Sequence, residues 1–302
     1  MKHREPSRHD PRKPIRSAET VAWCRALAHL EPNPPVSCPD SLAHIFLNPV
    51  FRILLRPAPF WRWLTEKKAP GLYHLHFGRT LYIDDALRDG VANGASQLVL
   101  LGAGYDSRPY RMHDGLRGAR VFEVDFPGTQ ERKKRCLRKH FGELPDHVTF
   151  VPIDFEVESL DEGLGNAGYD PQAKTVFLWE GVCCFLTPEA VDEVVRFVSH
   201  NSAPGSRLVF DLWDGQVIEG DHSAFGAKQL MRVTAKIGEP IIWGLHRGGR
   251  DDELPEWLAS RGLDLVDAST PEQMERRYFG SDTRRRMMAC FRMVTSEVRS
   301  SQ

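Results

Sequence analysis

The chain has 302 residues, of which 41% are hydrophobic and 27% are charged. This composition can bury a substantial core, as one large domain or as one domain with an appended cap. Forty Lys and Arg residues against 41 Asp and Glu residues give a net charge of -1. Because this balance lacks the positive field typical of nucleic-acid-binding proteins, we expect no nucleic-acid partner.

Cysteine usage and the N-terminus indicate a cytoplasmic protein. The six cysteines contain no CxxC pair and no regular spacing, so they predict neither a zinc site nor a disulfide framework. Residues 1–16 are rich in basic residues and proline, and we expect a disordered basic tail rather than a signal peptide. No stretch reaches the roughly 20 apolar residues of a membrane span, so we expect no membrane partner.

The first part of the chain is predicted to be helical. Ser17 can cap a helix that Pro32 stops. A second apolar stretch, Leu42–Leu54, approximates helical spacing, although Pro49 argues for a break. We therefore expect an N-terminal helical cap over residues 17–96.

From residue 97 onward, short apolar runs alternate with helical stretches. Five runs are predicted to be strands buried on both faces: Leu98–Leu101, Val121–Val124, Val148–Val151, Thr175–Trp179 and Leu208–Phe210. Between the last two, Thr187, Pro188 and Glu189 are typical of a helix start. This β-α-β rhythm indicates a mainly parallel sheet.

After Asp211 the rhythm lapses, and we expect a lid insertion over about residues 214–250 with a helix near 225–237. The chain then returns to a helix over 254–260 and to two strands, 263–266 and 287–294. The predicted fold of residues 97–302 is therefore α/β: a doubly wound, Rossmann-like sheet of seven strands, mainly parallel, with the last strand antiparallel.

A glycine loop follows the first predicted strand. Two glycines in Gly102-Ala103-Gly104 let the backbone approach a ligand closely at the sheet edge where nucleotides bind. The same pattern fits a dinucleotide, but Ser107 stands where its third glycine would be. Asp106 would repel phosphates, whereas an acid beside Arg108 suits a zwitterionic amino-acid tail. The loop therefore favours S-adenosylmethionine over a dinucleotide.

Acidic residues follow three further strands. Asp125, 21 residues past Gly104, can accept hydrogen bonds from both hydroxyls of a ribose. Asp154 and Glu180 follow the next two strands. Because the carboxyl ends of parallel strands meet at one edge of the sheet, these acids and the glycines together predict a nucleoside site.

Between Ser17 and Asp211 the chain resembles the leucine carboxyl methyltransferase family. The matching motifs, in order, are Ser17–Leu27, Gly78-Arg79-Thr80, Ile83-Asp84-Asp85, Leu100–Arg108, Phe122–Pro127, Val151–Phe155, Glu180-Gly181-Val182, Phe185-Leu186-Thr187 and Ala203–Ser206. The family includes phosphatase-tail methyltransferases and bacterial S-adenosylmethionine enzymes, some of which O-methylate aromatic polyketides.

The resemblance implies a role for each matching residue. Arg79 would hold the carboxylate of the cofactor, and Gly102, Ala103, Gly104 and Asp106 would surround its methionine part. Asp125 would bind the ribose, and Asp154 and Phe155 would flank the adenine. Glu180 would lie near the methionine end or the reacting centre, which makes it the candidate catalytic residue. Phe185 replaces a tyrosine common in the family, so contacts to the methyl acceptor do not carry over.

Several other residues have a structural as well as a functional interpretation. His74 and His76 would share one face of a strand, but no suitably spaced acid or cysteine lies nearby, and we expect no metal. Cys183 and Cys184 are expected to be packed loop residues rather than nucleophiles. Arg284–Arg286 are expected at a solvated strand entry, with an anion-binding role as the alternative.

An acceptor pocket is expected between the cap from Trp23 to Trp63, the loop Glu180–Thr187 and the insertion Asp214–Gly249. Trp61, Trp63, Trp243 and Trp257 are expected in core or cap packing, although the first two could wall an aromatic pocket.

We expect an O-methyltransferase acting on a carboxylate or hydroxyl of a small molecule. A carboxylate is ionised at neutral pH and needs no general base, whereas a phenol needs one. The alternatives are a protein C-terminal carboxylate as acceptor, an NAD-dependent oxidoreductase, and a non-catalytic nucleoside-binding or partner-binding protein. The sequence does not predict the oligomeric state.

Overall fold

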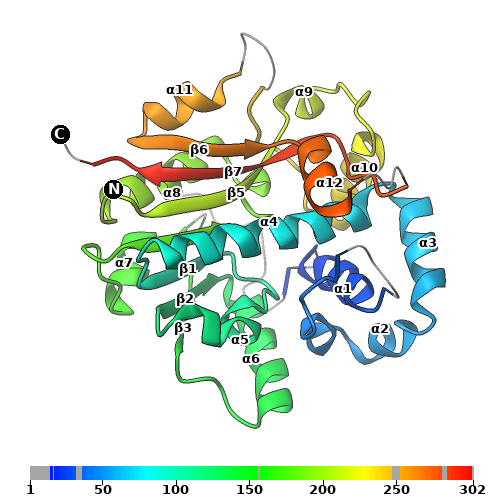
Figure 1. The fold of residues 1–302 in the computed structure, drawn as a ribbon, viewed down its shortest axis with the longest axis horizontal. Helices are drawn as coiled ribbons and strands as arrows, with labels where there is room; N and C mark the ends of the chain where they lie inside the picture. The colour runs from blue at the N-terminus through cyan, green and yellow to red at the C-terminus, as the bar shows by residue number, and fades with distance from the viewer. Residues whose placement is uncertain are drawn as a thin grey trace.

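The computed structural model describes residues 14–15, 17–31, 36–155, 157–246, 252–280 and 284–300. Its centre is a seven-stranded sheet in the order β3-β2-β1-β4-β5-β7-β6 (Figure 1). The strands are β1 (Gln97–Leu101), β2 (Arg120–Asp125), β3 (Val148–Pro152), β4 (Thr175–Trp179), β5 (Arg207–Trp213), β6 (Leu263–Ser269) and β7 (Phe291–Val298). The strands β1 to β5 pair in parallel, and β7 is antiparallel to both β5 and β6. The predicted fold class is confirmed.

Twelve described α-helices surround the sheet: α1 (Ser17–His29), α2 (Pro49–Leu54), α3 (Ala58–Lys68), α4 (Leu72–Ala92), α5 (Arg108–Arg111), α6 (Pro127–Phe141), α7 (Leu160–Asn166), α8 (Pro188–His200), α9 (Gly215–Ile218), α10 (Ala227–Ile237), α11 (Leu254–Ala259) and α12 (Pro271–Phe279). Three 3₁₀ turns join them: η1 (Ala43–Phe46), η2 (His113–Leu116) and η3 (Cys183–Phe185). Among the described residues, no helix is long and apolar enough to cross a membrane.

Side chains of the central strands alternate between two cores, one on each face of the sheet. In β1, Leu98 and Leu100 belong to the core that includes α4, and Val99 and Leu101 belong to the core that includes α8. All five β1 residues are buried, as the continuous apolar run predicts. The helix α8 begins at Pro188 because the Thr187 side chain accepts a hydrogen bond from the Ala190 amide, which confirms the predicted helix start.

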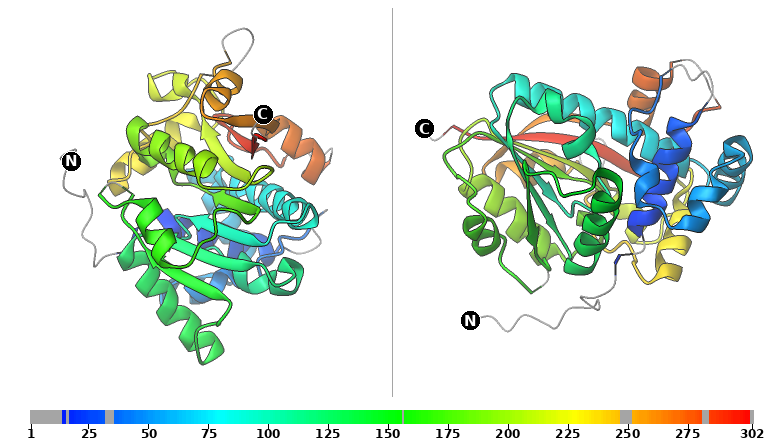
Figure 2. Two further views of the ribbon diagram at one scale, coloured as in Figure 1. Left: turned by 90° about the vertical axis from the view of Figure 1, so that its left-hand side faces the viewer. Right: turned by 90° about the horizontal axis from the view of Figure 1, so that it is seen from below.

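The order of strands reverses direction at β1. The chain builds β2 and β3 on one side of β1, then crosses to build β4 and β5 on the other. In doubly wound sheets, ligands bind at the carboxyl ends of the strands at such a switch point. The helices α1, α2 and α3 form a block beyond one end of the sheet, beside α10 (Figure 2).

The long helix α4 lies across one face of the sheet (Figure 1) and contacts β4, β5 and β7. It packs closely on the sheet at Gly90, where a Cβ atom would lie 2.3 Å from Cγ2 of Val176 in β4. His74 and His76 lie on this helix, so the strand that we expected for them is wrong. The segment can be a buried helix because its polar side chains, such as Arg79 and Asp84, have ion-pair partners in the interior. All residues from Tyr73 to Asp84 are buried.

Two predicted strands differ in detail. The last strand is β7, which spans Phe291–Val298 rather than residues 287–294. Just before it, the amide of Ala289 donates to the carbonyl of Phe225, and the carbonyl of Cys290 accepts from the amide of Asp214. The bond between Asp214 and Cys290 continues the register of β5 and β7 by one residue. The amide of Ala289, in contrast, bonds away from the sheet, so the strand does not begin at residue 287. At the edge of the sheet, β3 leaves Thr149 and Pro152 exposed, so it is not buried on both faces as expected.

The close packing of α4 on β4 predicts that Gly90→Ala destabilises the fold by about 1–3 kcal/mol, because the new methyl group overlaps Val176. The free energy of unfolding in urea measures this effect. The matched control is Gly165→Ala in α7, where no atom lies within 4 Å of the added methyl. This change should leave stability unchanged or raise it by up to about 1 kcal/mol. Equal effects at the two glycines would contradict the assigned packing.

Candidate cofactor and acceptor site

The loop after β1 is fixed to both neighbouring strands. Gly102 (φ 69°) and Gly104 (φ 44°) have positive φ, which residues with side chains disfavour. A Cβ atom at Gly102 would lie 2.4 Å from Cγ2 of Val182, which follows β4. The amide of Gly104 donates a hydrogen bond of 2.8 Å to Oδ2 of Asp125 at the end of β2. The loop therefore has little freedom to move away from the edge of the sheet.

Beyond this loop, Arg108 is fully buried and contacts three carboxylates. Its guanidinium lies 2.7 Å from Oδ1 of Asp84, 2.5 Å from Oδ2 of Asp106 and 2.7 Å from Oε2 of Glu180. Burial lowers the pKa of Arg108, but the three carboxylates outweigh it and raise the pKa well above its usual value. Arg108 is thus a permanent cation that joins α4, the glycine loop and the end of β4.

Glu180 lies between two guanidinium groups. Arg108 occupies one oxygen, and Nε of Arg79 donates to the other at 3.0 Å. Burial raises the pKa of Glu180, but the charges of Arg79 and Arg108 lower it by more. The pKa therefore lies well below its usual range. A carboxylate held ionised in this way does not take up a proton at neutral pH, so it is not suited to act as a general base.

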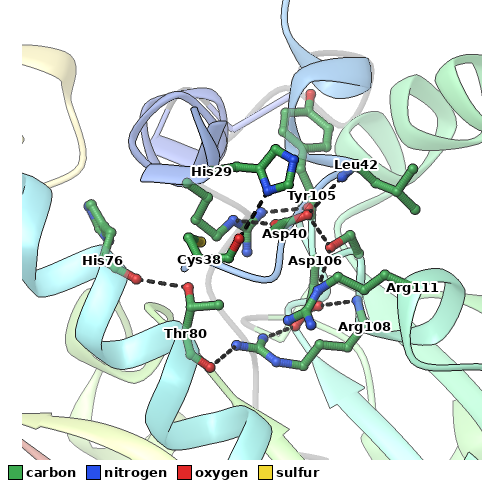
Figure 3. Close-up of polar contacts among 12 residues, drawn as sticks. His29, Cys38, Asp40, Leu42, His76, Thr80, Tyr105, Asp106, Arg108 and Arg111 are labelled. Atoms are coloured by element: carbon green, nitrogen blue, oxygen red, sulfur yellow. Dashed lines mark hydrogen bonds and ion pairs between the residues drawn. The ribbon is translucent and has the colours of Figure 1, made fainter. Parts of the chain in front are cut away.

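Arg79 also fixes the state of a histidine. Its Nη1 donates to Oδ2 of Asp211 at 3.1 Å, and its Nη2 lies 3.2 Å from Nδ1 of His76. A guanidinium can only donate, so Nδ1 accepts and the ring proton of neutral His76 is assigned to Nε2. Burial, and then the charge of Arg79, hold the pKa of His76 well below its usual value. The ring is directed away from the ion pairs around Arg108 (Figure 3).

A second set of polar contacts ties the cap to the glycine loop (Figure 3). Asp40 accepts a hydrogen bond of 2.6 Å from Oγ of Ser107 and forms an ion pair of 3.1 Å with Nε of Arg25 in α1. Nη2 of Arg25 also donates to the carbonyl of Tyr105 at 2.6 Å. The cap and the loop after β1 are therefore one polar unit, although more than 60 residues separate Asp40 from Ser107.

Asp125 is buried at the end of β2 and lines the pocket. Burial raises its pKa to about 7, although the amides of Phe126 and Gly104 donate to the carboxylate and oppose this rise. Near neutral pH the carboxyl group is therefore partly protonated, and a ligand that donates hydrogen bonds to the carboxylate would favour its ionised form. Below the loop, Lys133 and Glu123 form a fully buried ion pair of 2.9 Å.

A pocket of about 270 Å³ opens where these elements meet. All nine residues that the sequence assigned to the cofactor line it: Arg79, Gly102, Ala103, Gly104, Asp106, Asp125, Asp154, Phe155 and Glu180. The structure thus brings together residues from α4, from the glycine loop and from the ends of β2, β3 and β4. Ile15, a described residue of the expected tail, also lines the pocket, and its amide donates to Oγ1 of Thr129 at 2.9 Å. Residues 1–13 and 16 of that tail lie outside the described residues.

The other half of the pocket is largely apolar. Three helices supply Ala18 and Val21 (α1), Leu72 and Leu75 (α4), and Leu230, Val233 and Ile237 (α10). Further apolar lining comes from the loop after β4, which includes Phe185 and Leu186, and from Trp213 and Ile241. The amide of Ser17 donates to Oε2 of Glu239, which joins the start of α1 to the segment after α10. Part of the insertion predicted as a lid therefore covers the pocket. Residues 247–250 of that insertion lie outside the described residues.

The cap contributes less to the pocket than expected. Trp61 and Trp63 are absent from the described lining, and Trp63 is 56% exposed, so the expectation that it packs in the core or cap is wrong. The reason is that α2 and α3 lie beyond α1, which separates them from the pocket. Trp243 is buried, as expected, and packs against Trp257 at 5.5 Å.

Cys183 and Cys184 are buried in η3, as expected. Burial raises the pKa of both thiols well above the usual value, which disfavours the reactive thiolate form. The arginines Arg284–Arg286 do not enter a strand, because β7 begins at Phe291. Instead, Arg285 pairs with Glu31 and the guanidinium of Arg286 lies 4.4 Å from the ring centre of Phe225.

The charges around the site favour a cationic ligand. Four guanidinium groups, of Arg25, Arg79, Arg108 and Arg111, are connected to five carboxylates, of Asp40, Asp84, Asp106, Glu180 and Asp211. Asp125 adds a further acid to the pocket lining. An excess of acids suits a sulfonium and repels a pyrophosphate, so the residues present fit S-adenosylmethionine better than a dinucleotide.

The fold and the site define a Rossmann-like, S-adenosylmethionine-dependent methyltransferase. A family model described as leucine carboxyl methyltransferase matches residues 18–199, and the chain belongs to this family.

Named relatives agree with this assignment. The chain is 36% identical over 203 residues to a Streptomyces avermitilis protein that carries the name of an S-adenosyl-L-methionine-dependent methyltransferase, with 66% of this chain and 70% of that protein covered. A Bacillus subtilis protein with the same kind of name is 28% identical over 230 residues, covering 74% and 71% of the two chains. Nothing in these comparisons supports the NAD-dependent alternative.

Two solved structures share the fold. A DUF574 family protein from Streptomyces avermitilis has a TM-score of 0.58 at 12% identity, with 92% of this chain and 96% of that chain covered. A structure from Thermobifida fusca described as a methyltransferase has a TM-score of 0.56 at 17% identity, with 96% of each chain covered. At these identities the likeness supports the fold alone.

Two features of the site were not predicted from the sequence. His76 had no expected function beyond a rejected metal site, because the helix that places it next to Arg79 was not predicted. Arg108 had no expected structural partner. The acids at positions 84, 106 and 180 were all visible in family motifs, but only the fold shows that they converge on one guanidinium.

The burial of Arg108 predicts that replacing it costs much more stability than replacing an exposed arginine. Arg108→Met should destabilise the protein by about 3–5 kcal/mol, because it leaves buried carboxylates without their cation. Arg88→Met should cost less than about 1 kcal/mol, because Arg88 is 55% exposed in its ion pair with Asp85. Urea unfolding of both variants provides the comparison. A cost at Arg108 no larger than at Arg88 would show that the buried ion pairs do not stabilise the fold.

Proposed function

We propose that this protein methylates an oxygen atom of a small, largely apolar molecule, and that the oxygen is ionised at neutral pH before it reacts. The observation that carries this proposal is the pocket itself. One half is lined by the polar residues at the strand ends, and the other half by apolar side chains of α1, α4 and α10. An apolar acceptor placed in the second half would meet the cofactor at the boundary.

The proposed cofactor contacts follow from the residues at the strand ends. Asp125 would accept hydrogen bonds from the ribose hydroxyls, and Asp154 and Phe155 would flank the adenine. Arg79 and the loop Gly102–Asp106 would surround the methionine part. S-adenosylmethionine, when bound, supplies an electrophilic methyl group to the acceptor. The ion pairs of Arg108 hold the glycine loop and Glu180 in place, so these contacts are preorganised before binding.

The absence of a suitable base narrows the acceptor class. Three described residues near the apolar half of the pocket could act as bases. Glu180 is paired with two arginines, Oε2 of Glu239 accepts from the amide of Ser17, and His76 accepts through Nδ1 and carries its proton on Nε2. We propose that none of the three takes the proton from an ordinary alcohol. A carboxylate, or a phenol or enol acidic enough to ionise unaided, needs no such base. We propose that Nε2–H of His76 donates to the oxygen-bearing group of this acceptor and orients it.

The pocket favours a small molecule over the C-terminal carboxylate of a protein. Its described lining contains two cationic side chains, Arg25 and Arg79, and both are paired with acids. A polar peptide backbone would also find few partners among the apolar side chains of α1 and α10.

The proposed function is tested with a panel of apolar carboxylic acids, acidic phenols and simple alcohols. The purified protein should convert one or more of the acids or acidic phenols to a methyl ester or ether, detected by mass spectrometry, and should leave the alcohols unchanged. Turnover of alcohols alone would contradict the argument from the missing base. Cofactor binding without turnover of any acceptor in a broad panel would favour the non-catalytic alternative.

His76 gives a sharper test once an acceptor is found. His76→Phe should raise the acceptor KM by about tenfold or more, because it removes the Nε2–H donor, with little change in the Kd for S-adenosylhomocysteine. His76→Gln retains a donor and an acceptor and should recover part of the loss. If His76→Phe weakens S-adenosylhomocysteine binding as much as acceptor binding, His76 has only a structural role.

The raised pKa of Asp125 predicts a pH dependence for cofactor binding. The ionised carboxylate accepts two hydroxyl hydrogen bonds, so binding favours the deprotonated form. The affinity for S-adenosylhomocysteine should therefore rise by about tenfold between pH 6 and pH 8, with a midpoint near the pKa of about 7. Calorimetric titration across this range measures the effect.

Two variants control this measurement. Asp125→Asn should bind more weakly and without the pH dependence, because it cannot ionise. Asp85→Asn, which removes an acid outside the described pocket lining, should keep both the affinity and the slope. A flat pH profile in the unaltered protein would exclude Asp125 as the ribose ligand.

A further inference from the structure

Five of the ten most exposed large apolar side chains in the described residues lie on two adjacent short helices. They are Val50 (62% exposed), Phe51 (39%), Ile53 (76%), Phe60 (48%) and Trp63 (56%), on α2 and α3, and we refer to them as the apolar patch. The other five lie elsewhere: Leu30, Phe141 and Val233 singly, and Leu265 and Val266 next to each other in β6. Scattered apolar residues are ordinary on a protein surface, whereas a contiguous group indicates a contact surface.

Ring contacts show that the aromatic members of the patch are continuous. Phe51 lies 5.4 Å from Trp23, and Trp23 lies 5.9 Å from Trp61. The ring of Phe60 lies 5.1 Å from that of Trp61 and 6.1 Å from that of Trp63, so it connects the two. The five rings form one chain across the outer side of the cap, with Trp23 and Trp61 partly buried beneath the others.

The two helices leave most of their surface open. No residue of α2 is buried, and Ala58 is the one buried residue of α3. Both helices lie at the outer edge of the molecule in two perpendicular views (Figures 1 and 2). Helices normally bury an apolar stripe, so these two present an unpartnered surface.

The same segment is strongly basic. Between residues 49 and 68, the exposed cations are Arg52, Arg56, Lys67 and Lys68. The segment contains one acid, Glu66, whose carboxylate accepts hydrogen bonds from the amides of Gly71 and Tyr73. Nζ of Lys67 lies 4.9 Å from the ring centre of Trp63, so charge and aromatic surface are adjacent. The patch is therefore an apolar centre with a basic rim on a chain whose net charge is -1.

We propose that this surface docks the protein on an anionic lipid bilayer. Tryptophan and phenylalanine side chains partition to the headgroup boundary, and lysine and arginine around them attract anionic headgroups. This proposal departs from the expectation of no membrane partner, which rested on the lack of a spanning stretch. Spanning a membrane needs about 20 apolar residues, but binding at its surface does not. A second copy of the chain is a poorer occupant, because a symmetric dimer would bring the basic rims together.

The helix α1 connects this surface to the pocket. Trp23 contacts the rings of the patch, while Ala18 and Val21 of the same helix line the apolar half of the pocket. A protein docked in this way would have its pocket one helix away from the lipid, where apolar molecules concentrate. The lipid-binding surface is independent of the proposed methyl transfer, and it is tested without an acceptor.

The full-length protein is mixed with large unilamellar vesicles of phosphatidylcholine alone, or with 30–40% phosphatidylglycerol added (roughly the anionic fraction that gives a strong surface potential), and sedimented. We expect binding to the anionic vesicles, weakened by salt, and little binding to the neutral ones. Ile53→Ser/Trp63→Ser and Arg52→Glu/Lys68→Glu should each reduce partitioning roughly tenfold or more. Thermal stabilisation by S-adenosylhomocysteine shows that each variant is folded.

Matched controls carry the same changes elsewhere. Leu265→Ser/Val266→Ser removes two exposed apolar residues of β6, and Arg135→Glu/Lys139→Glu reverses two exposed cations of α6. Both should bind vesicles like the unaltered protein. Equal binding to neutral and anionic vesicles, equal losses in the control variants, or no vesicle binding would overturn the proposal. A dimer in solution that the patch variants dissociate would instead assign the surface to a second copy of the chain.

Discussion

The buried guanidinium of Arg108 is the interaction on which the site depends. It brings carboxylates from α4, the glycine loop and the end of β4 within 2.7 Å of one group. An uncompensated charge at this position would be very costly, so the three segments are held in one arrangement. Glu180 then presents its second oxygen to Arg79, which in turn fixes the tautomer of His76. A single cation thereby connects the glycine loop and Glu180 to Arg79 and His76, which all line or border the pocket.

The fold was predictable because its signals are local. Each of the runs Leu98–Leu101 and Thr175–Trp179 is a strand with nearly the predicted limits, since a parallel strand buried on both faces must be apolar throughout. The strand ends then brought the predicted acids and glycines to one pocket. The start of the last strand was misplaced because Met287 and Met288 are buried apolar residues, as in a strand, but the amide of Ala289 bonds to Phe225 outside the sheet.

What the sequence could not reveal is which charges meet. The partner of Arg79 at position 211 is 132 residues away, and no spacing rule connects them. Periodicity also failed for α4, where buried residues such as His76, Arg79 and Asp84 are polar and conceal the helical pattern. These exceptions have one physical cause: a buried ion-pair network places charged residues where a core normally has apolar ones, and so it removes the signal on which prediction relies.

The wide sequence separation of these ion pairs has a consequence for how the protein folds. Asp84, Arg108 and Glu180 can be buried together only after α4, β1 and β4 have assembled, because any one of them sealed without the others would leave a bare charge in the interior. Contacts between residues so far apart along the chain form slowly. The sheet can therefore take shape before the site does, and the ligand-binding edge of this enzyme is expected to be the last region to become ordered.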